Sequence, residues 1–260
     1  HNHANTETIV GHATLATGAL PAVHGMIGNV WYDDKLQRLV YNVEDAKYPL
    51  LSADADVNQK TEIDPTQRTA KSSGRSPSNI QVSTFSDELM IASNGKAKVF
   101  GVSVKDRGAI SMAGHMGKAF WFSKKSGEFV TSEYYYDKYP EWVSSWNAAK
   151  PTKKYDKKTW QLSQPQTNYV FGKQDDQKWE TKFPGFGRTF PHQYGDMKNG
   201  YFNTFLTLSP AGDELTLDFA KAVVNNEQLG QDNITDYLSV SFSSTDYVSH
   251  IFGPSSLEAE

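Results

Sequence analysis

The sequence predicts an α/β fold in which a mostly parallel sheet is flanked by helices, and three observations support this. Helix-like and strand-like segments recur with short connections, which is the pattern of a parallel sheet covered by helices. Residues 97–104 form an apolar run that is typical of a buried strand. The length of 260 residues is sufficient for one large α/β domain with a sizeable core.

The first expected element is a helix within residues 5–18. Thr6 or Thr8 supplies a start signal, and the residues that follow run on in helical spacing to Gly18. Gly18 and then Pro21 mark its end, because glycine is favoured just after a helix and proline shortly beyond it.

Short strands, a long loop and a second helix are expected next. Residues 52–78 are rich in Asp, Lys, Gln, Ser, Gly and Pro, which indicates the loop. The regular elements of this part are, in order, strands at 30–32 and 39–43, a helix at 87–92, and strands at 97–104 and 119–122.

The remainder of the chain begins with an irregular stretch. Residues 134–190 are rich in Tyr, Trp, Lys and Pro without clear periodicity, and we expect them to form an inserted cap or lobe. Helical spacing returns at Leu215 and ends by Gly230, and residues 237–242 read as a strand. The expected division is a first α/β part at 1–133, an inserted lobe at 134–205 and a return to the α/β domain at 206–260.

Composition excludes several classes of protein. The formal net charge of −4 argues against a nucleic-acid-binding protein, which normally carries a basic face. No apolar run approaches the length needed for a membrane span. The absence of cysteine excludes thiol catalysis, thiolate metal sites and disulfides.

The first candidate for chemistry is Thr8, at the expected start of the first helix. A hydroxyl there faces unpaired backbone N–H groups and the positive end of the helix dipole, which favour an alkoxide and a phosphate oxygen alike. An ordinary N-cap is the alternative, and it is the commonest role of threonine before a helix.

The second candidate is the segment from Lys105 to Gly108, directly after the strand that ends at Val104. In open parallel sheets, ligands bind at the carboxyl ends of the strands. If the segment is extended, Lys105 and Arg107 point the same way and can hold one anion together, for which the planar guanidinium is well suited. A solvated turn of mixed charge is the alternative.

The third candidate is the pair Asp246 and His250, after the strand that ends at Phe242. In a helical turn, positions i and i+4 share a face, so the carboxylate and the imidazole would converge. Such a pair suits zinc, although it is one ligand short of a catalytic site, and a local hydrogen bond between the two side chains is the alternative.

In this order the segments resemble one family, the threonine-dependent, phosphate-irrepressible alkaline phosphatases, which are exported bacterial relatives of the nucleotide pyrophosphatase/phosphodiesterases in the alkaline phosphatase superfamily. Residues 6–29 resemble the nucleophile region and 104–115 the phosphate-binding segment. Residues 243–254 resemble a metal-ligand motif, and 126–142 a further stretch of the same branch.

The resemblance implies an alkaline phosphatase-like three-layer sandwich and a role for each candidate. Thr8 would attack phosphorus and become phosphothreonine, while Asn29 would donate to a phosphoryl oxygen. Lys105 and Arg107 would hold the other oxygens of a small-molecule phosphate monoester. The resemblance implies two Zn²⁺ ions in the intact enzyme, one of them bound by Asp246 and His250.

The resemblance also implies what lies outside this chain. The family has a metal-binding Asp before the nucleophile, and an Asp-His pair and a final His after the last motif. We therefore expect a fragment that is cut at both ends, with an incomplete sheet, poor zinc binding and no activity alone. Ser249 stands where the family often has Gly. A periplasmic or secreted location follows from the resemblance alone.

Two alternatives stay open. A phosphodiesterase or nucleotide pyrophosphatase of the same superfamily would use Thr8 with a different pocket. A non-catalytic binding module on the same scaffold would use the aromatic residues between Tyr134 and Trp160 as its contact surface.

Overall fold

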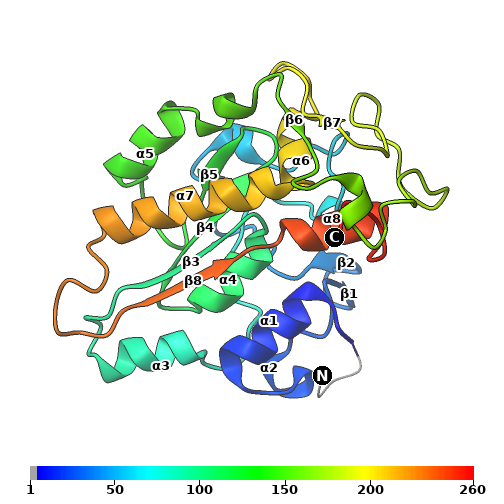
Figure 1. The fold of residues 1–260 in the computed structure, drawn as a ribbon. Coiled ribbons are helices and arrows are strands. Elements are labelled where there is room, and N and C mark those ends of the chain that lie inside the picture. The colour runs from blue at the N-terminus through cyan, green and yellow to red at the C-terminus, as the bar shows by residue number, and fades with distance from the viewer. Residues whose placement is uncertain (1–4) are drawn as a thin grey trace.

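The computed structural model describes residues 5–260, and its centre is a four-stranded sheet (Figure 1). The strands are β3 (Val99–Ser103), β4 (Lys118–Ser123), β5 (Glu128–Val130) and β8 (Tyr237–Ser241), in the order β5-β4-β3-β8. Strand β3 runs parallel to both β4 and β8, and only β5 is antiparallel to its neighbour. The α/β class with a mostly parallel sheet is therefore confirmed.

Helices cover both faces of this sheet (Figure 1). Helix α4 (Asp106–Ala113) packs on β3 and β4, and α1 (Thr8–Thr17) and α3 (Phe85–Ala92) lie against α4. The opposite face is covered by the long helix α7 (Pro210–Asn226). Each of the parallel strands β3 and β8 leads directly into a helix, α4 and α8 (Ser244–Phe252) respectively.

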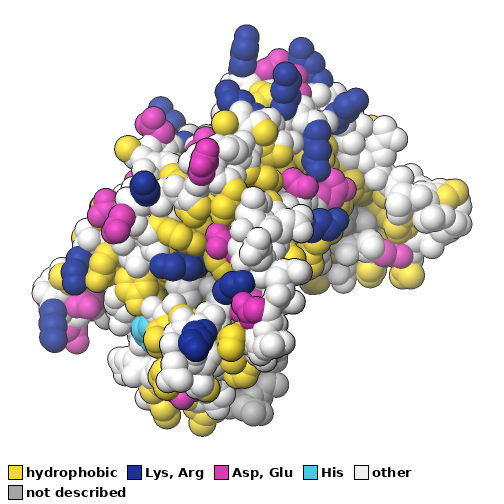
Figure 2. All heavy atoms as spheres, turned by 90° about the vertical axis from the view of Figure 1, so that its left-hand side faces the viewer, with side chains coloured by type: hydrophobic (Ala, Val, Ile, Leu, Met, Phe, Trp, Pro, Cys, Tyr) yellow, Lys and Arg dark blue, Asp and Glu magenta, His cyan; other side chains and the backbone are white. Residues whose placement is uncertain are grey.

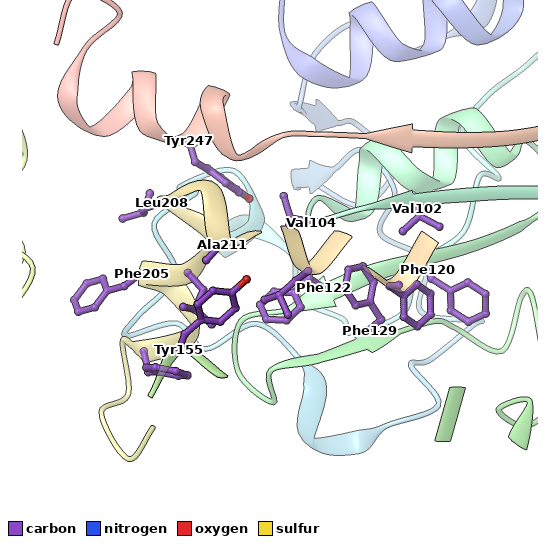
Figure 3. Packing of buried hydrophobic residues seen from close by; sticks show 14 of the residues in the cluster. Val102, Val104, Phe120, Phe122, Phe129, Tyr155, Phe205, Leu208, Ala211 and Tyr247 are labelled. Atoms are coloured by element: carbon purple, nitrogen blue, oxygen red, sulfur yellow. The ribbon is translucent and has the colours of Figure 1, made fainter. Parts of the chain in front are cut away.

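The two apolar layers follow from the period of two along strand β4. Phe120 and Phe122 belong to the hydrophobic cluster under α7, whereas Ala119 and Trp121 belong to the cluster shared with α1 and α4. Successive side chains of a strand point to opposite faces, so one apolar strand supplies both layers. Figure 3 shows the first cluster, in which Phe120, Phe122 and Phe129 pack side by side beneath β3.

Helix α4 lies unusually close to β3, and Gly101 permits it. A Cβ atom at Gly101 would lie 2.2 Å from the carbonyl oxygen of Ala109. Any larger residue would push the helix away from the sheet and would move the residues at the start of α4 with it.

Several elements were not expected from the sequence. Helix α7 begins at Pro210, ahead of the periodic stretch, because the Ser209 side chain caps it by accepting from Ala211 N–H. Strands β1 (Val30–Asp33) and β2 (Arg38–Tyr41) lie where the sequence predicts strands. The elements without a counterpart in the sequence analysis are α2 (Pro21–His24), α5 (Glu141–Ala148), β6 (Thr159–Trp160), β7 (His192–Gln193), α6 (Phe202–Thr207) and four short 3-10 helices at Ala53–Ala55, Gln67–Thr69, Pro151–Tyr155 and Gln166–Asn168.

Aromatic side chains of the stretch 134–205 join the core. Tyr155 is buried in the cluster under α7, and Trp142 and Trp146 pack against it. Both indole rings approach Phe219 of α7, with centroid distances of 5.4 and 5.1 Å. These aromatic residues therefore stabilise the face of the sheet that α7 covers.

The surface carries charges of both signs. Figure 2 shows Lys and Arg side chains interspersed with Asp and Glu on the face formed by the C-terminal end of α7 and by α3. Within residues 5–260, no helix combines the length and the apolar character that crossing a bilayer would require.

Candidate active site

Thr8 is the first residue of helix α1. The position before the helix is held by Glu7, which has an extended backbone and makes no side-chain cap, so Thr8 does not serve as the N-cap. The Glu7 carboxylate instead accepts from the backbone N–H of Asn29. Thr8 is half-buried, and its hydroxyl lies at the positive end of the helix dipole.

Asn29 is fixed next to Thr8 by several bonds. Its Oδ1 accepts from the backbone N–H of Ile9 in the first turn of α1, at 3.2 Å. Its carbonyl oxygen accepts from the Asn42 side chain at 2.7 Å. The side chain is 9 % exposed, and its location between α1 and β1 follows from these contacts.

Lys105 and Arg107 are both nearly buried, and the segment is not extended throughout, since Lys105 has an extended backbone and Arg107 is helical. Helix α4 begins at Asp106, so Lys105 precedes the helix and Arg107 is its second residue. The turn forms because Asp106 Oδ1 accepts from the backbone N–H of Arg107 at 2.7 Å, and Arg75 Nε donates to Asp106 Oδ2 at 2.8 Å. The two cations therefore meet at a helix N-terminus, where an anion is favoured.

Arg107 connects the loop after β2 with the start of α1. Its Nη1 donates to Asp64 Oδ2 at 2.7 Å and to the Tyr41 hydroxyl at 3.0 Å. Its Nη2 lies 3.5 Å from Thr8 Oγ1. The guanidinium thus faces the Thr8 hydroxyl with one end and a buried carboxylate with the other.

Lys105, after strand β3, forms an ion pair with Asp246, after the neighbouring strand β8. Because β3 and β8 are neighbours, the helices that follow them start side by side, and Lys105 Nζ forms an ion pair with Asp246 Oδ2. The ammonium also lies 4.2 Å from the centre of the Tyr247 ring. Burial, and then the charge of Arg107, lower the pKa of Lys105 to about 8, although Asp246 acts in the opposite direction.

Asp246 and His250 lie one turn apart on α8, as the spacing indicates. His250 Nε2 is 3.5 Å from Asp246 Oδ2. Two ligands of a tetrahedral zinc ion, each about 2.0–2.1 Å from the metal, lie roughly 3.4 Å apart, so this pair fits one edge of such a site. Among residues 5–260, no group of three or more His, Cys, Asp or Glu is placed to hold a metal ion.

A cavity of about 300 Å³ unites most of these groups. Thr8 lies next to it through Arg107, and Asp246 lies next to it through Lys105. The residues that line the cavity are Asn29, Ile63, Asp64, Pro65, Thr66, Lys105, Arg107, Tyr247, His250 and Ile251. The structure therefore brings all six residues singled out in the sequence to one region.

Sequence reasoning missed the groups that surround the two cations. Asp64 lies in the loop 52–78, where a carboxylate followed by proline gave no sign of burial. Tyr41 ends strand β2, and its hydroxyl donates to Asp106 at 2.6 Å. Tyr247 follows Asp246 in the chain; it is 3 % exposed, and the ammonium group of Lys105 lies over its ring.

Comparisons with known proteins agree on one family. The model of the family "Type I phosphodiesterase / nucleotide pyrophosphatase" matches residues 1–260. Alkaline phosphatase PhoV of Synechococcus elongatus is 38 % identical over 98 % of this chain and 44 % of its own length. Alkaline phosphatase PafA of Elizabethkingia meningoseptica is 36 % identical over 100 % of this chain and 45 % of its own length.

Solved structures agree with these relatives. The crystal structure of wild-type PafA superposes with a TM-score of 0.82 at 35 % identity, over 97 % of this chain and 46 % of that one. A second PafA structure, also with a TM-score of 0.82, carries substitutions of a threonine, an asparagine, a lysine and an arginine. This chain spans less than half the length of these relatives.

Proposed function

Since this chain belongs to the type I phosphodiesterase / nucleotide pyrophosphatase family, within the alkaline phosphatase superfamily, we propose that the intact enzyme hydrolyses small-molecule phosphate monoesters with Thr8 as the nucleophile. The observation that carries the proposal is the position of Arg107, whose Nη2 lies 3.5 Å from Thr8 Oγ1 at the edge of a cavity that also contains Lys105. A phosphoryl group in front of Thr8 would meet both cations.

The substituted PafA variant supports the choice of residues. In that protein the substituted threonine and asparagine are 21 residues apart, as are Thr8 and Asn29 here. The substituted lysine and arginine are two residues apart, as are Lys105 and Arg107. Residue type and order therefore match at four positions, and the spacing matches within each of the two pairs.

The proposed reaction has two steps. Thr8 Oγ forms a bond to phosphorus as the ester P–O bond breaks, and the hydroxyl proton leaves with the alcohol. Water then cleaves the phosphothreonine, which releases inorganic phosphate and restores Thr8. Arg107 and Lys105 neutralise the non-bridging oxygens, and Asn29, whose Oδ1 is taken by Ile9 N–H, offers its Nδ2 donors.

Asp246 and His250 are proposed as ligands of zinc, because their separation fits one edge of a tetrahedral site. A bound zinc ion would supply Lewis-acid stabilisation of negative charge on oxygen. The second zinc ion remains a proposal that rests on the resemblance to alkaline phosphatases, as does a periplasmic or secreted location.

The test compares hydrolysis of a nitrophenyl phosphate monoester with hydrolysis of the corresponding diester by the intact, zinc-loaded enzyme. Monoester hydrolysis should dominate and should fall by more than about 10³-fold in Thr8→Ala, because this variant lacks the hydroxyl that would attack phosphorus. Thr8→Ser is the matched control, since it keeps a hydroxyl and should retain activity. Full monoester hydrolysis by Thr8→Ala would refute the role of Thr8.

A phosphodiesterase is the second candidate, and the charge of the cavity favours it. Arg107 is paired with Asp64, and Lys105 with Asp246, so the two cations are largely neutralised by the protein itself. A diester carries less negative charge than a monoester and needs less compensation. Preference for the diester in the same assay would assign the chain to this activity.

A further inference from the structure

Arg107 is held in place by two groups that bind its Nη1 atom. Its Nη1 donates to both Asp64 and the Tyr41 hydroxyl. The side chains of Arg107 and Asp64 are only 3 and 6 % exposed. An ion pair buried to this degree is held in one geometry far more firmly than a pair on the surface.

These bonds determine which edge of the guanidinium is available. The group can hold two oxygens at once through Nη1 and Nη2 or through Nε and Nη2. Nη1 is occupied, and Nη2 lies near Thr8. Within residues 5–260, Nε of Arg107 is buried and has no hydrogen-bond partner. The Nε–Nη2 edge is therefore the one left for an oxyanion in front of Thr8.

Asp64 is itself fixed by a second set of bonds. Its Oδ1 accepts from the backbone N–H and the hydroxyl of Thr66, at 2.9 and 2.6 Å. Its own backbone N–H donates to Glu62, which is ion-paired with Lys124 at 2.5 Å. Burial raises the pKa of Asp64, but the charges of Arg107 and Lys124 outweigh it, so the net pKa is lowered and the carboxylate stays ionised.

We infer that Asp64 is a positioning residue, which turns the Nε–Nη2 edge of Arg107 toward the phosphoryl oxygens of the substrate. The inference rests on the proposed phosphate chemistry and deepens it. Asp64 touches no reacting atom, and its positioning effect is transmitted through Arg107. Its carboxylate lies in the wall of the cavity, so it also has an opposing effect, since a negative charge repels a bound anion.

The two effects of Asp64 predict opposite outcomes when the carboxylate is removed. If Asp64 acted only as a negative charge, both Asp64→Ala and Asp64→Asn would tighten the binding of inorganic phosphate. If Asp64 orients Arg107, Asp64→Ala should weaken phosphate binding by about 10- to 100-fold, the range expected for one hydrogen bond to a charged group. Asp64→Asn keeps one acceptor oxygen and should lose less.

The experiment measures inorganic phosphate binding by titration calorimetry on the purified protein and its variants. In an Arg107→Ala background, Asp64→Ala should no longer weaken phosphate binding, because the residue that Asp64 positions is absent and only the repulsion by its carboxylate is removed. Asp87→Asn is the matched control. Asp87 is equally buried and bonded, but its contacts are with Thr84 and with residues 115 and 116, away from the cavity. This variant should leave phosphate affinity unchanged.

Three results would overturn the inference. They are tighter phosphate binding in Asp64→Ala, unchanged binding in that variant, and an equal loss with and without Arg107. Failure of the unchanged protein to bind phosphate would instead overturn the proposed function. The two failures are therefore distinguishable.

Discussion

Replacing Arg75 with methionine should destabilise the protein by about 3 kcal/mol. The Arg75 and Asp106 side chains are 3 and 4 % exposed, and removal of one member of such a pair typically costs about 3–5 kcal/mol because a buried charge is left alone. Asp106 retains the Tyr41 hydroxyl and the backbone N–H of Arg107 as donors. Their presence places the expected loss at the lower end of that range.

Equilibrium unfolding in urea measures this loss, as the change in the free energy of unfolding. Arg38→Met is the control, because Arg38 also pairs with a carboxylate, Glu44, but is 31 % exposed. Its loss should be smaller, about 1 kcal/mol, because the Glu44 carboxylate, although only 5 % exposed, keeps the backbone N–H groups of Lys71 and Ser72 as donors. Equal losses in the two variants, or a loss below about 1 kcal/mol for Arg75→Met, would refute the view that this buried pair anchors the start of α4.

Two further predictions concern the core and the pH dependence of stability. Phe219→Ala should lower the free energy of unfolding by about 3–5 kcal/mol, since the ring is fully buried and stacks on Phe129 at 4.3 Å; urea denaturation measures this, and a loss under about 1 kcal/mol would contradict it. The hydrogen bond to Asp87 raises the pKa of His115 above 6.5, against the effect of burial. The folded state therefore binds this proton more tightly, and the stabilisation is complete below pH 6.5 and is lost as pH rises through the folded-state pKa. The difference in melting temperature between the unchanged protein and His115→Gln should accordingly be largest below pH 6.5, and a difference that grows with pH would contradict it.

Strands and helices could be predicted from the sequence where local signals were strong. Strand β3 and the helical pair Asp246 and His250 were predictable because apolar runs and i, i+4 spacing are local properties. The six candidate residues were predictable mainly through the resemblance, because the three clusters are weak signals one at a time. The structure adds that they share one region.

The misses have physical causes. The extended arrangement considered for the segment from Lys105 to Gly108 is present only at Lys105, because bonds from distant residues to Asp106 favour a helical turn beyond it. Asp64 could not be found, because its burial depends on contact with Arg107, which is 43 residues away in the chain. Contacts of this kind leave no local pattern in the sequence.

The pairing of β3 with β8 has a consequence for how the chain can vary. This pairing joins residues about 138 positions apart. The starts of α4 and α8, which carry Lys105 and Asp246, are therefore brought together by closing one long loop. The entropic cost of closing a loop rises only logarithmically, by about 0.6 kcal/mol for each doubling of its length. Residues can therefore be gained or lost in the peripheral part of the intervening 134–205 stretch with little effect on stability, while Lys105 and Asp246 stay together. The periphery of the domain can therefore change in length while the charged pair beside the cavity keeps its place.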